Sequence, residues 1–244
     1  MGLPYFGGSE NDAISLTLAH MRERTPFAVF TPGATVAACA SRDDALHALL
    51  RSADLLLPDG VGCSIAARLC GFSPLPRIAG IDFAERLFAA CAMDAVRVFL
   101  YGGKEGVAAR AAARLRERYP HVIFSYTDGY GADPFRRIAA FSPHIVCVCL
   151  GAGKQERWID THKREVGGVL IGLGGSLDVW AGDVRRAPRF LQRAHLEWAW
   201  RTLCEPRRVT RLFPLPVYFA KCLAFRYSSK CQKRKEKADS DVNL

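Results

Sequence analysis

The sequence predicts an α/β fold: a Rossmann-like, mostly parallel sheet flanked by helices, with a basic amphipathic C-terminal appendage. Short apolar runs alternate with helix-forming segments through the middle of the chain, which is typical of right-handed βαβ units. Glycine-rich turns follow several of these runs. The last 44 residues differ in kind, because eleven Lys or Arg against four Asp or Glu give them +7 of the net charge of +10.

The first predicted elements lie between residues 26 and 69. The run at 26–30 (PFAVF) is the first expected strand, because aromatic and β-branched residues favour strands. Residues 43–51 (DDALHALLR) place apolar side chains at helical spacing and predict a helix. A short strand at 54–57 ends in the turn Pro-Asp-Gly, and residues 61–69 are expected to form the next helix.

The second half of the sheet follows the same alternation. Residues 96–101 (VRVFLY) predict a strand, and 105–118 predict a helix because strong helix formers carry apolar residues on one face. In parallel sheets, ligands bind beyond the carboxyl ends of the strands, so the Gly-rich turns at 102–103, 151–153 and 172–175 mark the edge where a site is expected. The remaining elements are a strand at 122–126, a helix at 134–140, a strand at 144–150, a helix at 155–165 and a strand at 169–173.

The chain length fits one core with an appendage. We expect a Rossmann-like core over residues 1–200, a basic membrane-associating appendage over 201–231 and a disordered tail over 232–244. Residues 212–225 are apolar and aromatic, are interrupted by two prolines and a lysine, and are flanked by basic residues, which suits the anionic face of a bilayer. A C-terminal helix docked on the core, with a solvated charged end, is the alternative.

Composition excludes several classes of protein. The nine cysteines form no CxxC pair and no zinc-ligand spacing, and the odd number argues against a secreted disulfide framework. No signal peptide and no run of about 18 apolar residues is present, so we predict a cytoplasmic protein that lies peripherally on the inner face of the cell membrane. The body is nearly neutral, so no nucleic-acid partner is expected; an exposed apolar tail would allow homo-oligomers.

The strand end at 169–175 is a candidate phosphate site. Glycines after a strand let backbone N–H groups approach a phosphate closely, and arginines hold its oxygens in a planar fork. We therefore predict Gly172, Gly174 and Asp178 as substrate-binding residues. The turn at 102–106 (GGKEG) is out of register for a dinucleotide motif, so a plain βα turn is the alternative there.

Polar residues follow the other strand ends. Asp59 lies in a turn of small residues, where it is either a general base toward a sugar hydroxyl or the cap of the next helix. Arg77 and Asp82 surround a glycine; Asp82 binds a sugar, pairs with Arg77 or caps a helix. Gln155 and Glu156 begin a helix after GAGK, which lacks the Ser or Thr of a P-loop, so we reject an ATPase and expect ligand contact.

Together these segments resemble the WecG/TagA/CpsF family of bacterial glycosyltransferases (glycosyltransferase family 26) over roughly residues 10–213. The similarity is specific because five blocks occur in the family's order. These blocks read LLLPDGVGCSIAARLCG, RIAGIDF, VFLYGGKEGVAARAAARL, PHIVCVCLGAGKQERWI and IGLGGSLDVWAG…RRAPRFLQRAHLEWAWRTLCEPRRVTRLF.

The resemblance implies an inverting transfer of a sugar from a UDP-sugar donor to a polyprenyl-diphosphate-linked saccharide, in cell-surface or exopolysaccharide biosynthesis. The sugar would be N-acetylmannosamine, its uronate or glucose. The resemblance implies no cofactor and no metal, and it assigns the role of catalytic base to Asp59. It also assigns substrate contact to Thr31, although Gly33 replaces the Asn of the family's Thr-x-Asn block.

The leaving UDP carries negative charge, which metal-free chemistry must stabilise with arginines and helix N-termini. Arg207, Arg208 and Arg211 are the predicted candidates. Two other classes stay open. A non-catalytic membrane- or nucleotide-binding protein with the same core would not need Asp59. A nucleotide-dependent oxidoreductase would need a GxGxxG turn in register.

Overall fold

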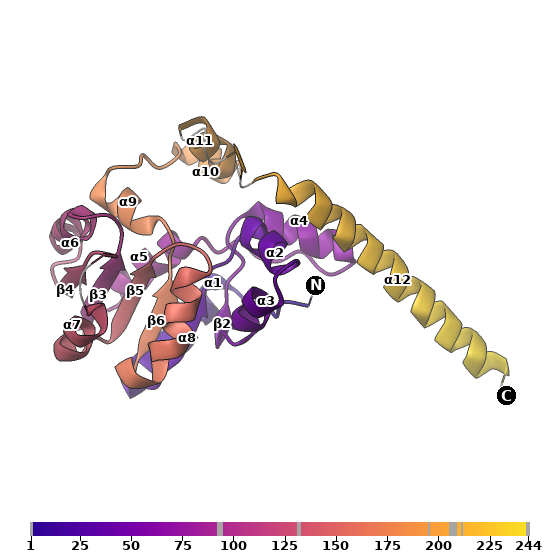
Figure 1. Cartoon of the computed structure of the whole chain (residues 1–244), viewed down its shortest axis with the longest axis horizontal. Helices are drawn as coiled ribbons and strands as arrows, with labels where there is room; N and C mark the ends of the chain where they lie inside the picture. Colours follow the sequence, from indigo (N-terminus) through magenta and orange to yellow (C-terminus); the bar gives the residue numbers. More distant parts are fainter. Residues whose placement is uncertain are drawn as a thin grey trace.

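The computed structural model describes residues 2–91, 95–130, 133–194, 196–204, 209–210 and 212–242. For Arg189, Arg193, Arg201 and residues 229–242 it describes the backbone alone. The described part is an α/β fold built on one six-stranded sheet, with helices on both faces and a long C-terminal helix that projects from the body (Figure 1).

All strand pairings of the described sheet are parallel, in the order β2-β1-β6-β5-β3-β4. The predicted strands are confirmed, with ends that shift by a few residues. The bounds are β1 Phe27–Phe30, β2 Leu55–Leu56, β3 Arg97–Gly102, β4 Ile123–Thr127, β5 Ile145–Cys149 and β6 Val169–Gly172.

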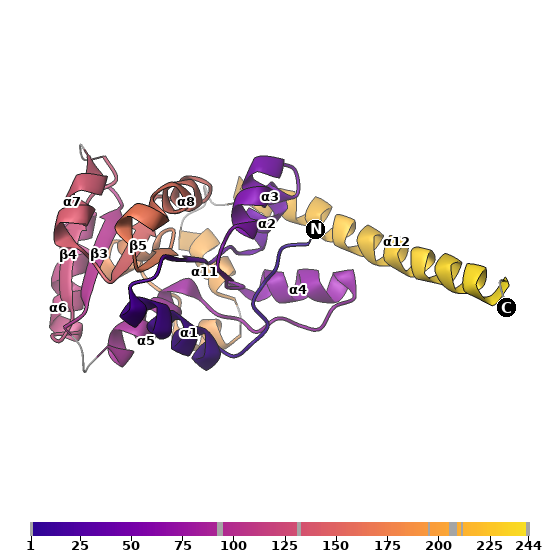
Figure 2. The same ribbon diagram turned by 90° about the horizontal axis from the view of Figure 1, so that it is seen from below.

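The sheet separates two apolar layers, because successive strand residues point to opposite faces. On one face Val98, Leu100 and Cys147 pack with α1 (Glu10–Glu23), α5 (Gly80–Ala90), α6 (Val107–Arg118) and α9 (Ser176–Ala181). On the other face Phe99 and Val146 pack with α3 (Asp44–Arg51), α7 (Pro134–Phe141) and α8 (Lys154–Val166). Figure 2 shows α1 and α5 on the side of the sheet opposite α3 and α8. The central strands are therefore buried on both sides, which explains their continuous apolar sequence.

Besides the C-terminal helix, the described ranges contain four further helices. They are α2 (Ala34–Ala40), α4 (Val61–Cys70), α10 (Arg189–Arg193) and α11 (Glu197–Cys204). Figure 1 shows α10 and α11 on the segment that links α9 to the C-terminal helix, above the carboxyl edge of the sheet. The helices α1, α2, α5, α9, α10 and α11 were not among those expected from the sequence.

The C-terminal helix α12 (Pro214–Val242) begins at the two prolines that the sequence pattern treats as interruptions. Proline is tolerated in the first turn of a helix, where its missing N–H would have no partner. Tyr218 and Cys222 are buried against Ala38 and Ala66 of α2 and α4. The start of α12 is thus docked on the core, and the predicted boundaries at 200 and 231 stay predictions.

None of the helices in the described ranges is both long and apolar enough to cross a membrane.

Candidate functional site

The candidate site is a cavity of about 790 Å³ at the carboxyl edge of the sheet. It lies where chain connections diverge: β1 leads to β2 on one side, while β6 leads to α9, which packs on α6 on the other. Ligands bind at such divergence points in parallel α/β sheets. The wall is formed by the loops after β1, β2 and β6, by the starts of α2, α4 and α5, and by α11 and α12.

Three helices begin at this wall without a capping side chain. The N-cap residues of α2, α4 and α5 are Gly33, Gly60 and Ala79, and none of them makes a side-chain cap hydrogen bond. The first residues of all three helices line the cavity. The N–H groups of a first helical turn lack partners inside the helix and carry partial positive charge, so they attract anions.

Asp59 lies in the cavity wall between β2 and α4, and its side chain is half-buried. Its backbone forms an isolated parallel bridge with Gly33, which joins the loops after β1 and β2. The N-cap of α4 is Gly60, at φ +86°, so Asp59 is not the cap residue that one interpretation of the sequence expected. The carboxylate is therefore placed at the cavity, as the general-base interpretation requires.

Two residues that the sequence analysis missed, Cys63 and Tyr5, contact backbone carbonyl groups of the loops around Asp59. The Cys63 thiol lies 3.5 Å from the Pro32 carbonyl oxygen and 3.7 Å from that of Asp59. The Tyr5 hydroxyl donates to the same Pro32 carbonyl at 3.2 Å. Burial raises the pKa of Cys63 to about 12 and raises the pKa of Tyr5 well above its ordinary value, so both groups are neutral beside Asp59.

Arg77 also lines the cavity, but it does not pair with Asp82, which was one of the alternatives that the sequence left open. Its guanidinium pairs with Glu197 of α11 at 2.9 Å, whereas Asp82 pairs with Arg186 at 2.5 Å. Asp82 is therefore neither the N-cap of α5, which is Ala79, nor the partner of Arg77. Burial alone would lower the pKa of Arg186, but the carboxylates of Asp82, Glu197 and Glu85 raise it overall.

Gln155 and Glu156 lie beneath the loops and are not among the residues that line the cavity. Only 5% of Gln155 and 1% of Glu156 are exposed. The Gln155 amide accepts from the Gly174 N–H at 2.8 Å and donates to Glu156 at 2.9 Å, and Glu156 accepts from the Gly153 N–H at 2.6 Å. Burial raises the pKa of Glu156. These two side chains join the loops after β5 and β6, and direct contact with a ligand stays a prediction.

The other predicted residues after β1 and β6 are not among those that line the cavity. Thr31 donates to the Gly172 carbonyl at 2.7 Å and so ties the end of β1 to that of β6. The first turn of α5 packs closely on Thr31, and only glycine fits at position 80, because a Cβ there would lie 2.8 Å from the Thr31 hydroxyl oxygen. Asp178 is half-buried in the first turn of α9.

The predicted arginines Arg207, Arg208 and Arg211 lie outside the described residues. Within the described ranges, no three His, Cys, Asp or Glu side chains form a group that could hold a metal ion. The described site therefore offers Arg77 and uncapped helix N-termini as its positive charge, with Asp59 as a carboxylate beside them.

The chain is similar to known glycosyltransferases over most of its length. The model of the family described as Glycosyl transferase WecG/TagA/CpsF matches residues 1–232. Similar relatives are named N-acetylglucosaminyldiphosphoundecaprenol N-acetyl-beta-D-mannosaminyltransferase. The one from Bacillus spizizenii is 37% identical over 195 residues, which cover 78% of this chain and 76% of the relative. The one from Bacillus subtilis is 33% identical over 222 residues, covering 88% and 87%. One from Staphylococcus aureus is 32% identical over 187 residues, covering 75% and 74%.

Proposed function

The chain belongs to the WecG/TagA/CpsF family of glycosyltransferases, and from this premise we propose that it transfers N-acetylmannosamine from its UDP-sugar to a polyprenyl-diphosphate-linked N-acetylglucosamine. The relatives' names supply the sugar and the acceptor. The nucleotide donor follows from the resemblance of the sequence blocks. The product would be a linkage disaccharide used in the synthesis of a cell-envelope polysaccharide.

One observation carries the proposal: the Asp59 residue, Arg77 and two uncapped helix N-termini belong to the wall of one cavity. Asp59 lies directly before the uncapped start of α4, and Arg77 lies shortly before the uncapped start of α5. Transfer from a UDP-sugar needs a base for the acceptor hydroxyl and positive charge for the leaving diphosphate. Both functions are available around one cavity, whose volume of about 790 Å³ is in the usual range for ligand pockets.

In the proposed reaction, Asp59 accepts the proton of the acceptor hydroxyl while that oxygen attacks the anomeric carbon. The bond from the anomeric carbon to the UDP oxygen breaks in the same step, so the configuration inverts. UDP leaves with negative charge, which Arg77 and the first-turn N–H groups of α4 and α5 stabilise. Arg207, Arg208 and Arg211 would add charge from the segment between α11 and α12. No metal is required in this scheme.

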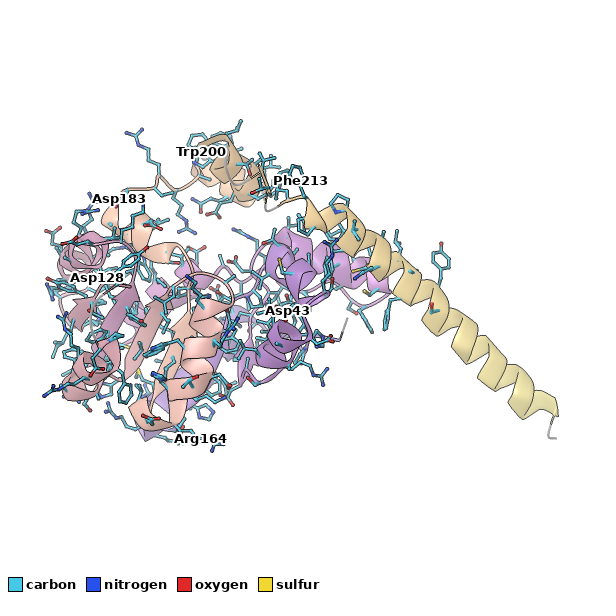
Figure 3. All side chains as sticks on the ribbon, in the orientation of Figure 1. Asp43, Asp128, Arg164, Asp183, Trp200 and Phe213 are labelled. Carbon is cyan, nitrogen blue, oxygen red and sulfur yellow. The ribbon has the colours of Figure 1, made fainter. Side chains whose placement is uncertain are left out.

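The acceptor's lipid places the enzyme at a membrane, and we assign this contact to the C-terminal segment. Exposed apolar side chains occur along it, among them Leu203 of α11, Phe213 and Leu223. Figure 3 shows Trp200 and Phe213 on the stretch from α11 to the start of α12, apart from the sheet. With the flanking basic residues, this segment suits the anionic inner face of the cell membrane. Leu212, Leu215 and Phe219 of this segment also line the cavity, so a polyprenyl chain bound along it would lie next to the site.

The test is a transfer assay with a panel of UDP-sugars, namely N-acetylmannosamine, its uronate and glucose, and with a lipid-linked N-acetylglucosaminyl diphosphate as the acceptor. The proposal expects transfer from UDP-N-acetylmannosamine that persists in EDTA and falls at least about 100-fold in Asp59→Asn. The matched control is Asp128→Asn, since Asp128 follows β4 at the same edge, bonds to the Tyr130 N–H and lies outside the cavity wall. Full activity of Asp59→Asn would overturn the assigned base. UDP binding without transfer from any donor would favour the non-catalytic nucleotide-binding alternative.

A further inference from the structure

Glu197 places a carboxylate beside the positive charge of the cavity. It lies at the start of α11, lines the cavity, and its side chain is only 13% exposed. One carboxylate oxygen lies 2.9 Å from Arg77, and the other lies 3.9 Å from the Nε of Arg186. That Nε is buried and has no hydrogen-bond partner in the described structure, although Asp82 binds the other end of the same guanidinium. Glu197 is therefore close to Arg186 but leaves the hydrogen-bonding capacity of its Nε unused.

A phosphate group fits this arrangement chemically. Guanidinium groups bind carboxylate and phosphate oxygens through the same planar donors, so one can replace the other at Arg77. A phosphate carries more negative charge and more acceptor oxygens than a carboxylate, and it can therefore accept from Arg77 and from the first-turn N–H groups of α5 together. Gly80 and Ile81 of that first turn line the same cavity as Arg77 and Glu197.

We propose that Glu197 is an internal competitor for a substrate diphosphate: it occupies the anion position at Arg77, and the diphosphate displaces it on binding. This inference rests on the proposed function, because that function supplies the diphosphate. The exchange releases the ion pair that holds α11 over the cavity. A second contact of α11 is the hydrogen bond that the Trp200 indole N–H donates to the Arg185 carbonyl oxygen at 3.4 Å. Substrate binding is thereby coupled to the position of α11.

Whether UDP binds more tightly or more weakly after Glu197 loses its charge tests the competitor role. Removing the charge of a competitor strengthens anion binding, whereas removing a merely structural group weakens it. The experiment measures the Kd of UDP for the full chain by calorimetry, for wild type and Glu197→Gln. We expect UDP binding about two- to fivefold tighter in Glu197→Gln, which corresponds to the usual range for a single ion pair. In the Arg77→Ala background, Glu197→Gln should give no gain. Unchanged or weaker binding in Glu197→Gln overturns the inference.

Glu85 provides a matched control. Its side chain is 14% exposed, pairs with Arg118 at 2.8 Å and accepts from the Trp180 indole at 3.0 Å, but it does not line the cavity. Glu85→Gln should leave the Kd of UDP unchanged; equal tightening in both variants would show a general charge effect and overturn the inference. Glu197→Asp is the second variant if Glu197→Gln does not fold, and it should tighten binding less.

The donor and the acceptor both carry a diphosphate, so the measurement uses two further probes. A short-chain N-acetylglucosaminyl diphosphate lipid tests the acceptor, and inorganic diphosphate tests the anion site alone. Tightening for UDP assigns the site to the donor, and tightening for the acceptor analogue alone assigns it to the acceptor. If wild type binds neither and shows no transfer, the proposed function fails. In that case, tighter binding of inorganic diphosphate to Glu197→Gln than to wild type still supports the competitor role, and equal or weaker binding overturns it.

Discussion

Replacing Gln155 with alanine tests whether this residue positions the loops or contacts the substrate. The change removes the acceptor of the Gly174 N–H and the donor to Glu156, at a place where both side chains are almost completely buried. An unsatisfied buried polar group costs about 1–3 kcal/mol, so two such groups cost about 2–6 kcal/mol. For a domain of this size, each kcal/mol lowers Tm by about 2–4 °C, which predicts a drop of about 4–24 °C.

Thermal unfolding followed by circular dichroism, with and without UDP, is the assay. Lys154→Ala is the control, because Lys154 is exposed one residue earlier in the same helical turn and should leave Tm unchanged. Gly172→Ala should resemble Gln155→Ala, since a Cβ at residue 172 would lie 3.0 Å from the Gln155 amide nitrogen. An unchanged Tm together with lost UDP affinity would refute the positioning argument and support direct contact instead.

Three further predictions follow from single contacts. Burial raises the folded-state pKa of Glu156 above its ordinary value of 4.5, so its contribution to stability is complete below pH 4.5 and is lost as pH rises through the folded pKa. In Glu156→Gln, the free energy of unfolding should fall less over this pH range, as measured by urea unfolding at several pH values. Gly102→Ala should destabilise the fold by about 3 kcal/mol or more in urea unfolding, because φ is +125° and the new Cβ would lie 2.3 Å from the Cys149 carbonyl oxygen. Tyr218→Ala should speed proteolysis between α11 and α12, since Tyr218 docks α12 on the core; an unchanged cleavage rate would contradict this docking.

The sheet was predictable because its strands are buried on both faces. Residues such as those of Ile145–Cys149 form continuous apolar runs that need no periodic pattern to be found. The missed helices gave weaker signals. The helix Ala34–Ala40 consists mainly of alanine, and Gly80–Ala90 begins without a capping side chain, because its N-terminus lines the cavity. The helix Glu10–Glu23 did carry a signal, since Ser9 and Asp12 form a capping box.

The site was predictable only in part, because distant segments meet in it. The position of Asp59 after a short strand indicated a ligand edge, and its place in the cavity wall agrees with that. One interpretation of the sequence paired Arg77 with Asp82, five residues away, whereas its partner Glu197 is 120 residues away in the chain. Gln155 and Glu156 had the sequence of an exposed first helical turn, and nothing local showed that the loop after β6 covers them.

The contacts of α12 connect the C-terminal segment to the cavity wall that contains Asp59. Leu215 and Phe219, spaced four residues apart on one face, line the cavity, whereas Tyr218 and Cys222 pack on α2 and α4. Helix α4 begins directly after Asp59 and Gly60, so a displacement of α12 changes both the apolar wall and the support of the helix that presents the carboxylate. If the membrane binds the exposed side of α12 and shifts this helix, the shift passes to the Asp59 loop through α4, on which α12 packs. Because Leu215 and Phe219 form part of the cavity wall, we expect removal of α12 to open the cavity itself.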